Sequence, residues 1–288
     1  MTTNQSFVLQ DVNTEILRKL LGISMSVTKS ETLNFTLTND KVVGIANNEA
    51  DSIYKKWSIQ LASLCTVPMT QDGTLQTIPE LKCSIYKGEE FSKKILSYFG
   101  QFVNFKIEHN GSEIKRIELF KTNDKGVTTL KINLLTAASA TAFIDYSKEF
   151  VDQIFTPDDT TKLVSFELDN DDLSTVSKLS RLSTNPEEQT NYVTIYTAGG
   201  TLKATDNAFD VILKEDIQIE IDPIEIDKSL WSMIDRDKYI VDVHTIEDNK
   251  ILVCTSQTKN VIISLVLLGK TDDSVNFDDF TNDDKTFM

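Results

Sequence analysis

Side chains with the chemistry for catalysis are few and isolated in this chain. The only two histidines, His109 and His244, each lie in an alternating stretch typical of a β-strand, where a lone histidine is more often packed than a ligand. Gly199 and Gly200 sit in a tight turn and lack the Lys-Ser/Thr that follows a phosphate-binding loop. The sequence has no serine elbow and no paired-histidine zinc motif. We therefore expect no catalytic residue, no cofactor and no enzymatic activity.

Acidic clusters and cysteines add no metal site. The cluster at 169–172 lacks the alternating ligands, central glycine and closing glutamate of a calcium-binding loop, so helix capping explains it better. Cys65, Cys83 and Cys254 are scattered and show no C-x-x-C spacing, which argues against a disulfide framework. We expect three buried free thiols in a reducing compartment, and no bound metal.

The chain as a whole is strongly acidic. Its 288 residues include 29 Lys+Arg and 44 Asp+Glu, a formal net charge of −15. This balance argues against a general nucleic-acid coat and against binding to an anionic membrane, because both need an excess of Lys and Arg. The first ten residues lack an apolar secretory core, and the longest apolar run, 261–268, is too short to span a bilayer. We expect a cytoplasmic protein with no membrane partner.

The sequence also contains an internal repeat. At a shift of 159 residues, Phe7 falls on Phe166, and each copy reads as a short strand, an Asp/Asn-rich helix start, an amphipathic helix and a β-hairpin. The hairpins turn at 39–40 and 199–200, with Asn-Asp and Gly-Gly pairs that tolerate the positive φ of tight turns. A duplicated structural unit follows from this pattern.

The second half of each copy repeats at a shift of about 135 residues, where 91–99 falls on 226–234 and both lead into further strands. Two helices with a larger number of antiparallel strands predict an α+β fold, duplicated as two domains that each pack two helices on antiparallel β-sheets. The first copy holds an insertion at 66–87, read as added strands or a long loop. The expected boundaries are 1–138 for the N-terminal domain, 139–157 for a connector, 158–270 for the C-terminal domain and 271–288 for an acidic flexible tail.

Positive charge is concentrated on the four predicted helices, 12–21, 91–100, 173–184 and 226–234. Together they carry a net charge of +5, so the rest of the chain carries −20. Solvated helix faces often carry Lys and Arg incidentally, but these helices occupy equivalent places in a repeat of an acidic protein. Arg18, Lys93, Lys178 and Arg181 lie off the apolar stripes and should face solvent. The basic residues of these four helices are Arg18, Lys19, Lys93, Lys94, Lys178, Arg181 and Lys228, the candidates for contact with an anionic partner.

This pattern resembles the DNA sliding clamps, which are polymerase processivity factors. A chain with two such units is similar to the trimeric clamps of tailed bacteriophages, archaea and eukaryotes rather than to the three-unit bacterial type. The local match is closest to the phage clamps, through the strand, Asp/Asn and helix start near the N-terminus and the Asp-Lys-Tyr-Ile-Val sequence at 237–241. As a pattern, the resemblance covers residues 6–270.

The resemblance implies a homotrimeric ring around double-stranded DNA, with helix cations facing phosphates without sequence specificity. It also implies a DNA polymerase and a separate clamp-loader ATPase as partners, and the host-cell cytoplasm as the location of a viral clamp. Partner peptides of clamps enter an apolar pocket beside the connector, which places this pocket between Ser139 and Phe155. The insertion at 66–87 and the tail with Phe277, Phe280 and Phe287 depart from the usual form.

Two alternatives fit the same sequence. One is a processivity subunit of the same fold that holds DNA on a basic face without forming a ring. The other is an acidic, β-rich structural or adaptor protein of a virion, in which the helix lysines are incidental. The mass of the particle in solution and its retention on circular DNA separate these alternatives from the ring.

Overall fold

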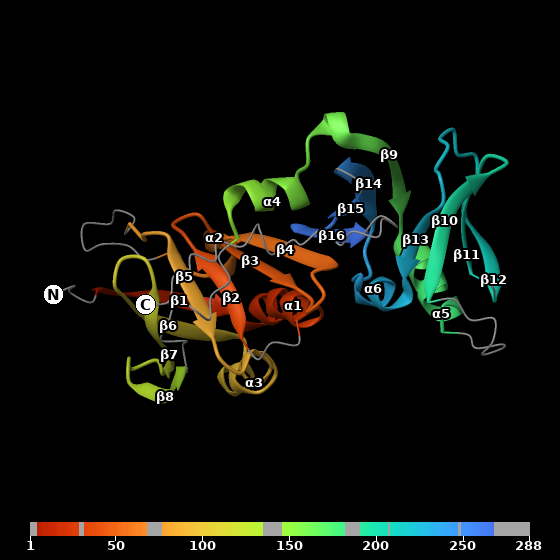
Figure 1. The fold of residues 1–288 in the computed structure, drawn as a ribbon. Coiled ribbons are helices and arrows are strands. Elements are labelled where there is room, and N and C mark those ends of the chain that lie inside the picture. The colour runs from red at the N-terminus through yellow and green to blue at the C-terminus, as the bar shows by residue number, and fades with distance from the viewer. Residues whose placement is uncertain are drawn as a thin grey trace. The chain divides into compact units, whose positions relative to one another are not determined.

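The computed structural model describes seven stretches of the chain (Figure 1). The chain divides into two compact units, Met1–Glu49 with Lys55–Asp145, and Ala50–Tyr54 with Tyr146–Met288. In both units helices pack with antiparallel β-sheets, so the predicted α+β class is confirmed. The tail expected at 271–288, the connector residues 139–145 and much of the insertion lie outside the described residues. The described stretches are 5–28, 32–67, 77–134, 146–181, 191–206, 208–246 and 249–267.

The first unit holds a sheet of strand order β1-β6-β7-β8 and a second run of strands in the order β5-β2-β3-β4. Strand β4 begins within the segment Ala50–Tyr54, which clusters with the second unit. Strand β5 lies within the expected insertion, but it corresponds to β13 of the second unit, so it is not an added strand. The elements are β1 (Gln5–Asn13), α1 (Thr14–Met25), β2 (Leu33–Leu37), β3 (Lys41–Asn47), β4 (Ile53–Gln60), α2 (Leu61–Leu64), β5 (Leu81–Ile85), α3 (Gly88–Lys93), the 3-10 helix η1 (Ile95–Phe99), β6 (Phe102–His109), β7 (Ile114–Thr122) and β8 (Thr128–Leu134).

The second unit holds a sheet of order β12-β11-β10-β13 and a run in the order β16-β15-β14-β9. These orders match those of the first unit strand for strand, so the internal repeat extends to the topology. The elements are α4 (Lys148–Phe155), the 3-10 helix η3 (Asp159–Thr161), β9 (Lys162–Leu168), α5 (Asn170–Leu179), β10 (Tyr192–Ala198), β11 (Thr201–Asp206), β12 (Phe209–Lys214), β13 (Ile224–Asp227), α6 (Lys228–Met233), β14 (Tyr239–Ile246), β15 (Asn249–Ser256) and β16 (Val261–Leu267).

Helix α1 illustrates how the sequence builds the core of the first unit. Its N-cap, Asn13, accepts hydrogen bonds from the first free backbone N–H groups. One face of the helix is buried, and there Ser24 Oγ accepts a 2.8 Å hydrogen bond from the indole of Trp57. That indole fills the space over Gly44, where an added Cβ would lie 2.2 Å from the ring. Glycine is therefore required at this point of β3.

The cysteines and histidines behave as packed residues. Cys65, Cys83 and Cys254 are buried free thiols, as expected, and burial raises the pKa of Cys65 and of Cys254 to about 12. His109 and His244 are each only 3% exposed. In the described part of the chain, no helix is both long and apolar enough to cross a bilayer.

Helix α4 was not predicted from the sequence. Ser147 caps it by accepting a hydrogen bond from Phe150 N, and Phe150, Ile154 and Phe155 are buried. Figure 1 shows the helix alongside β15 and β16, and Ser264 Oγ on β16 donates a 2.7 Å hydrogen bond to the carbonyl of Ile154. The signal was a serine cap followed by apolar residues at helical spacing, in a segment read only as a connector.

Candidate nucleic-acid interface

Helix α1 presents two of the seven candidate cations. Lys19 is exposed, and its Nζ lies 2.8 Å from Glu15 Oε1 one turn earlier. The hydrogen bond from Lys19 lowers the pKa of Glu15. Arg18 is partly buried, and its Nε is buried with no hydrogen-bond partner. Lys19 must therefore leave its glutamate before it can contact another anion, and only part of Arg18 reaches solvent.

Helix α3 begins three residues earlier than predicted and passes into η1, so its first turn includes Glu89 and Glu90. Lys93 Nζ lies 2.6 Å from Glu89 Oε1, and this hydrogen bond lowers the pKa of Glu89. Lys94 is exposed and has no ion pair within the described residues. The predicted charge of +2 for this helix is wrong, because residues 88–99 carry two acids and two bases.

Helix α5 carries its exposed cations at its end. Lys178 lies in the last turn, and Arg181 follows the helix, with its backbone N–H donating to the carbonyl of Lys178 at 3.3 Å. Within the described stretches neither side chain has an ion pair. The helix begins at Asn170 rather than 173 and ends at Leu179, and the expected end at 182–184 lies outside the described residues.

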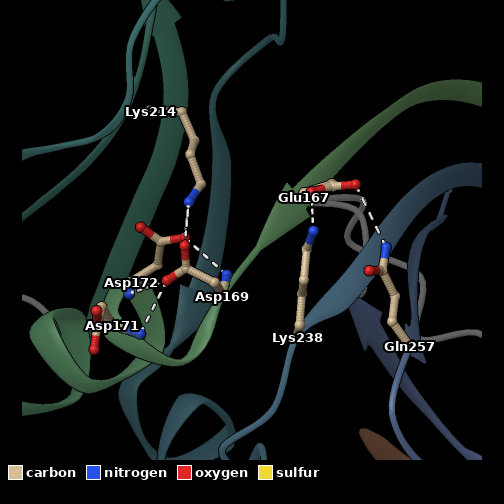
Figure 2. Close-up of polar contacts among 7 residues, drawn as sticks. All are labelled: Glu167, Asp169, Asp171, Asp172, Lys214, Lys238 and Gln257. Atoms are coloured by element: carbon tan, nitrogen blue, oxygen red, sulfur yellow. Dashed lines mark hydrogen bonds and ion pairs between the residues drawn. The ribbon is translucent and has the colours of Figure 1, made fainter.

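The N-terminus of α5 is held by a carboxylate pair that shares one lysine (Figure 2). Asp169 caps the helix, and Asp172 bonds back to the Asp169 N–H, which completes a capping box. Lys214 on β12 places its Nζ 2.6 Å from Asp169 Oδ2 and 2.7 Å from Asp172 Oδ2. This contact ties the start of α5 to strand β12.

The carboxylates of this pair differ in environment. The hydrogen bond from Lys214 lowers the pKa of Asp169 to about 2, whereas burial raises the pKa of Asp172. Burial also lowers the pKa of Lys214, but its hydrogen bonds to Asp169 and Asp172 outweigh this, and the net change is upward. The cluster is a structural support for α5, with all its charges satisfied inside it.

Lys228 is the first residue of α6. The sequence placed the start of this helix at Ile226, but Ile226 and Asp227 belong to strand β13. The Nζ of Lys228 lies 2.6 Å from Asp206 Oδ2, and the two side chains are 21% and 1% exposed. A lysine with a buried acidic partner is costly to pull away, since the carboxylate would be left without a countercharge. Lys228 therefore contributes little free positive charge at the surface.

The helices together carry less positive charge than the sequence predicted. As observed, α1, residues 88–99, α5 and α6 carry +1, 0, −1 and +1, a total of +1 rather than +5. The reason is physical: first turns attract acids that satisfy free N–H groups, and the predicted helices began after those turns. Helices α1 and α3 pack against each other in the first unit. Lys94, Lys178 and Arg181 remain as exposed cations without an acidic partner in the described residues.

Two exposed apolar side chains lie on strands β14 and β9, in the run of strands on which α4 packs. By the strand register, Ile240 of β14 points to the same side as Ser264, which contacts α4. Ile240 is 37% exposed and Leu163 of β9 is 60% exposed. At the side of Ile240, Glu167 accepts hydrogen bonds from Lys238 at 2.9 Å and Gln257 at 3.4 Å (Figure 2). Sequence reasoning did not name these residues, because only the strand register places them beside α4.

Comparison with known proteins identifies the fold. No family model matches the chain, and no curated protein matches it in sequence. The β subunit of DNA polymerase III from Pseudomonas aeruginosa matches with a TM-score of 0.57 at 11% identity, over 93% of this chain and 66% of that one. The sliding clamp from Bacillus subtilis matches with a TM-score of 0.57 at 11% identity, over 96% and 67%. The β chain from Streptococcus pneumoniae matches with a TM-score of 0.54 at 13% identity, over 95% and 67%.

These matches run through nearly all of this chain, but the chain spans only about two thirds of the length of the bacterial clamps. Sequence identities of 10–13% support a shared fold and do not by themselves support a shared function. The duplicated units of helices on antiparallel sheets thus have the fold of the DNA polymerase sliding clamps.

Proposed function

We propose that this protein is a DNA sliding clamp, a processivity factor that encircles duplex DNA, tethers the replicative polymerase and does no chemistry itself. The observation that carries the proposal is the match to sliding clamps over 93–96% of the chain, with the same unit built twice. A chain about two thirds as long as the bacterial clamps supports two units per chain. Three such chains, as in the phage type, would close a ring of six units.

Contact with DNA would come from the helix cations. Lys94, Lys178 and Arg181 are exposed and unpaired within the described residues, so they can reach phosphates directly. Arg18, Lys19, Lys93 and Lys228 are the weaker candidates, because each is partly buried or already paired. Phosphate contacts carry no sequence information and weaken with salt, which suits a protein that slides. The net charge of −15 for the whole chain discourages DNA from binding outside the ring, so retention would be topological.

Ring closure would use the open sheet edges. Strand β8 ends one sheet of the first unit and β12 ends one sheet of the second, and unpaired edge strands are templates for pairing with another chain. The counterpart of β8 in the repeat is β16, whose edge is covered, since Val266 N donates a 2.9 Å hydrogen bond to the carbonyl of Ser52. Pairing β8 of one copy with β12 of the next gives a head-to-tail contact that can close by rotation.

Partner peptides from the polymerase and the clamp-loader ATPase would bind beside α4. The exposed side chains of Ile240 and Leu163 offer an apolar surface there, and a polar pair, Glu167 and Lys238, borders Ile240. This location agrees with the pocket expected between Ser139 and Phe155, of which only the part from Tyr146 onward is described. The clamp would act in the cytoplasm of the cell in which replication occurs.

Retention on circular DNA tests the proposal. The protein is incubated with nicked circular DNA, a cognate clamp loader and ATP, and protein-bound DNA is isolated by gel filtration. Cutting the circle once should release the protein within minutes, while an uncut sample retains it. Protein that stays on the cut DNA would favour the non-ring subunit, and protein that never binds would favour the virion protein. Sedimentation should show particles of three chains.

A further inference from the structure

The chain forms a hollow just past the end of strand β12. It lies between the β10–β11 turn and residues 217–223, and its volume is about 480 Å³. Two hydrogen bonds hold its walls: Ile217 N donates to the Gly200 carbonyl at 2.8 Å, and Ile221 N donates to Thr197 Oγ1 at 2.8 Å. The residues between these anchors, Gln218 to Glu220, line the hollow. The hollow is thus built at the end of an open edge strand.

The wall of the hollow is acidic and partly apolar. Its lining includes two acids, Glu220 and Asp222, and no base. Two further acids, Glu215 and Asp216, come just before the lining segment. All four are exposed, while Ile217 and Ile219 are partly exposed. A fitting occupant carries a cation and a small apolar side chain.

Such an occupant exists on the other open edge of this chain. The β7–β8 turn, residues 123–127, is ordered by Asn123 Oδ1, which accepts hydrogen bonds from Lys125 N and Val127 N at 3.0 Å each. Gly126 supplies the positive φ, +74°, that the turn requires. Val127 is 58% exposed, and Lys125 is exposed with no ion pair in the described part of the chain. The turn also holds an exposed acid, Asp124, so its net charge is zero and only Lys125 itself complements the acids of the hollow.

Antiparallel pairing of the two edges brings the turn to the hollow. The neighbouring strands of both sheets are antiparallel, as in the pairs β7–β8 and β11–β12. If β8 of a second copy adds to β12 in the same sense, the start of β8 lies beside the end of β12. The strands have seven and six residues, so the turn that precedes Thr128 would extend just past Lys214.

We propose that the hollow at 217–223 receives the β7–β8 turn of a second copy of this chain, with Val127 against Ile217 and Ile219 and Lys125 beside Glu220. This inference rests on the proposed ring and adds a specific determinant to it. The ordered turn would fix the register of the edge strands, which backbone pairing alone leaves free to slip.

Cross-linking between copies tests the contact. The double variant Lys125→Cys/Gln218→Cys is treated with a short bismaleimide, and the products are separated on a denaturing gel. The native cysteines are buried and should not react. We expect covalent dimers and trimers. The matched control is Lys125→Cys/Ser97→Cys, which adds a thiol on exposed Ser97 of η1 and should stay monomeric on the gel.

Charge exchange provides the second measurement, by sedimentation equilibrium of the full chain. Lys125→Glu should weaken assembly about tenfold, and Lys125→Glu/Glu220→Lys should restore most of the affinity. A trimeric wild type with no cross-link and no effect of Lys125→Glu would overturn the hollow contact while leaving the ring intact. A wild type that is monomeric at every concentration would overturn the ring itself, and this inference with it.

Discussion

Strands β16 and β8 occupy the same place in the two repeats, yet their surroundings differ. Ile263 of β16 pairs with Cys254 and is fully buried, whereas its counterpart in β8, Ile132, pairs with Leu119 and is only partly buried. On the opposite face, Ser264 of β16 is buried under α4, while β8 carries one exposed charge there, Lys131. The covered strand β16 is apolar except for Ser264, whereas the open strand β8 keeps polar residues on one side. The unpaired edge of β8 is therefore open to pairing with another strand.

The largest effect should separate these two isoleucines. Ile263→Ala removes a buried side chain from a covered strand, so we expect it to lower the free energy of unfolding by about 3 kcal/mol. Ile132→Ala should cost about 1 kcal/mol in dilute monomer, because part of that side chain already faces solvent. Urea unfolding at submicromolar concentration measures both. Equal losses would mean that β8 is as well covered as β16.

The second comparison sets unpaired cations of the second unit against paired ones of the first. Lys178→Gln/Arg181→Gln should lower the slope of log affinity against log salt for duplex DNA by about 2, one for each phosphate contact. Lys19→Gln/Lys93→Gln removes the same charge, but each of these lysines already binds a glutamate. The control should change the slope by less than about 1. Fluorescence anisotropy over a salt series measures both slopes. Identical slopes for the two double variants would show that pairing with a glutamate does not decide which cations contact DNA.

The helix caps allow a smaller comparison. Asp169→Ala should destabilise the protein by about 1–2 kcal/mol, and Asn13→Ala, its counterpart at α1, by about 1 kcal/mol. The difference is expected because Asp169 also binds Lys214. Thermal and urea unfolding provide the measurement. A larger loss from Asn13→Ala would contradict the role of Lys214 as a support for α5.

The same cap predicts a dependence on pH. The pKa of Asp169 is about 2 in the folded protein against 3.8 for the free side chain, so the unfolded state binds the proton more readily. Its contribution is therefore present above about pH 4 and lost as pH falls toward 2. Because this side chain is 41% exposed, we expect about 1 kcal/mol. Unfolding of wild type and Asp169→Ala between pH 5 and 2 should converge at the acid end.

The smallest effect concerns the two buried histidines. Burial lowers the pKa of His109 and of His244 from 6.5, so both are neutral in the folded protein at pH 7. The unfolded state takes up protons first as pH falls below about 6.5, so stability should decline from that point. NMR titration of the two rings should give pKa values below those of a histidine peptide. A ring that titrates at or above 6.5 would contradict this account.

Much of the fold was readable from the sequence, and the reasons differ by element. Alternating residues in strands such as β10 and β14 report burial on one side, which is a local property. The start of α3 was misplaced, because Gly88, Glu89 and Glu90 come before the apolar spacing that begins at Phe91. Helix α4 was missed because its apolar face matters only against β15 and β16.

The sequence by itself determined the repeat, the α+β class, the buried thiols and the list of basic residues on helices. Only the tertiary structure decided which of those cations keep a free charge. The charge of Lys228 is balanced by the buried carboxylate of Asp206. Lys214, which the sequence did not single out, binds Asp169 at the start of α5. Strand pairing brings such partners together from distant positions, and electrostatic energy depends on distance and burial, which spacing along the chain does not encode.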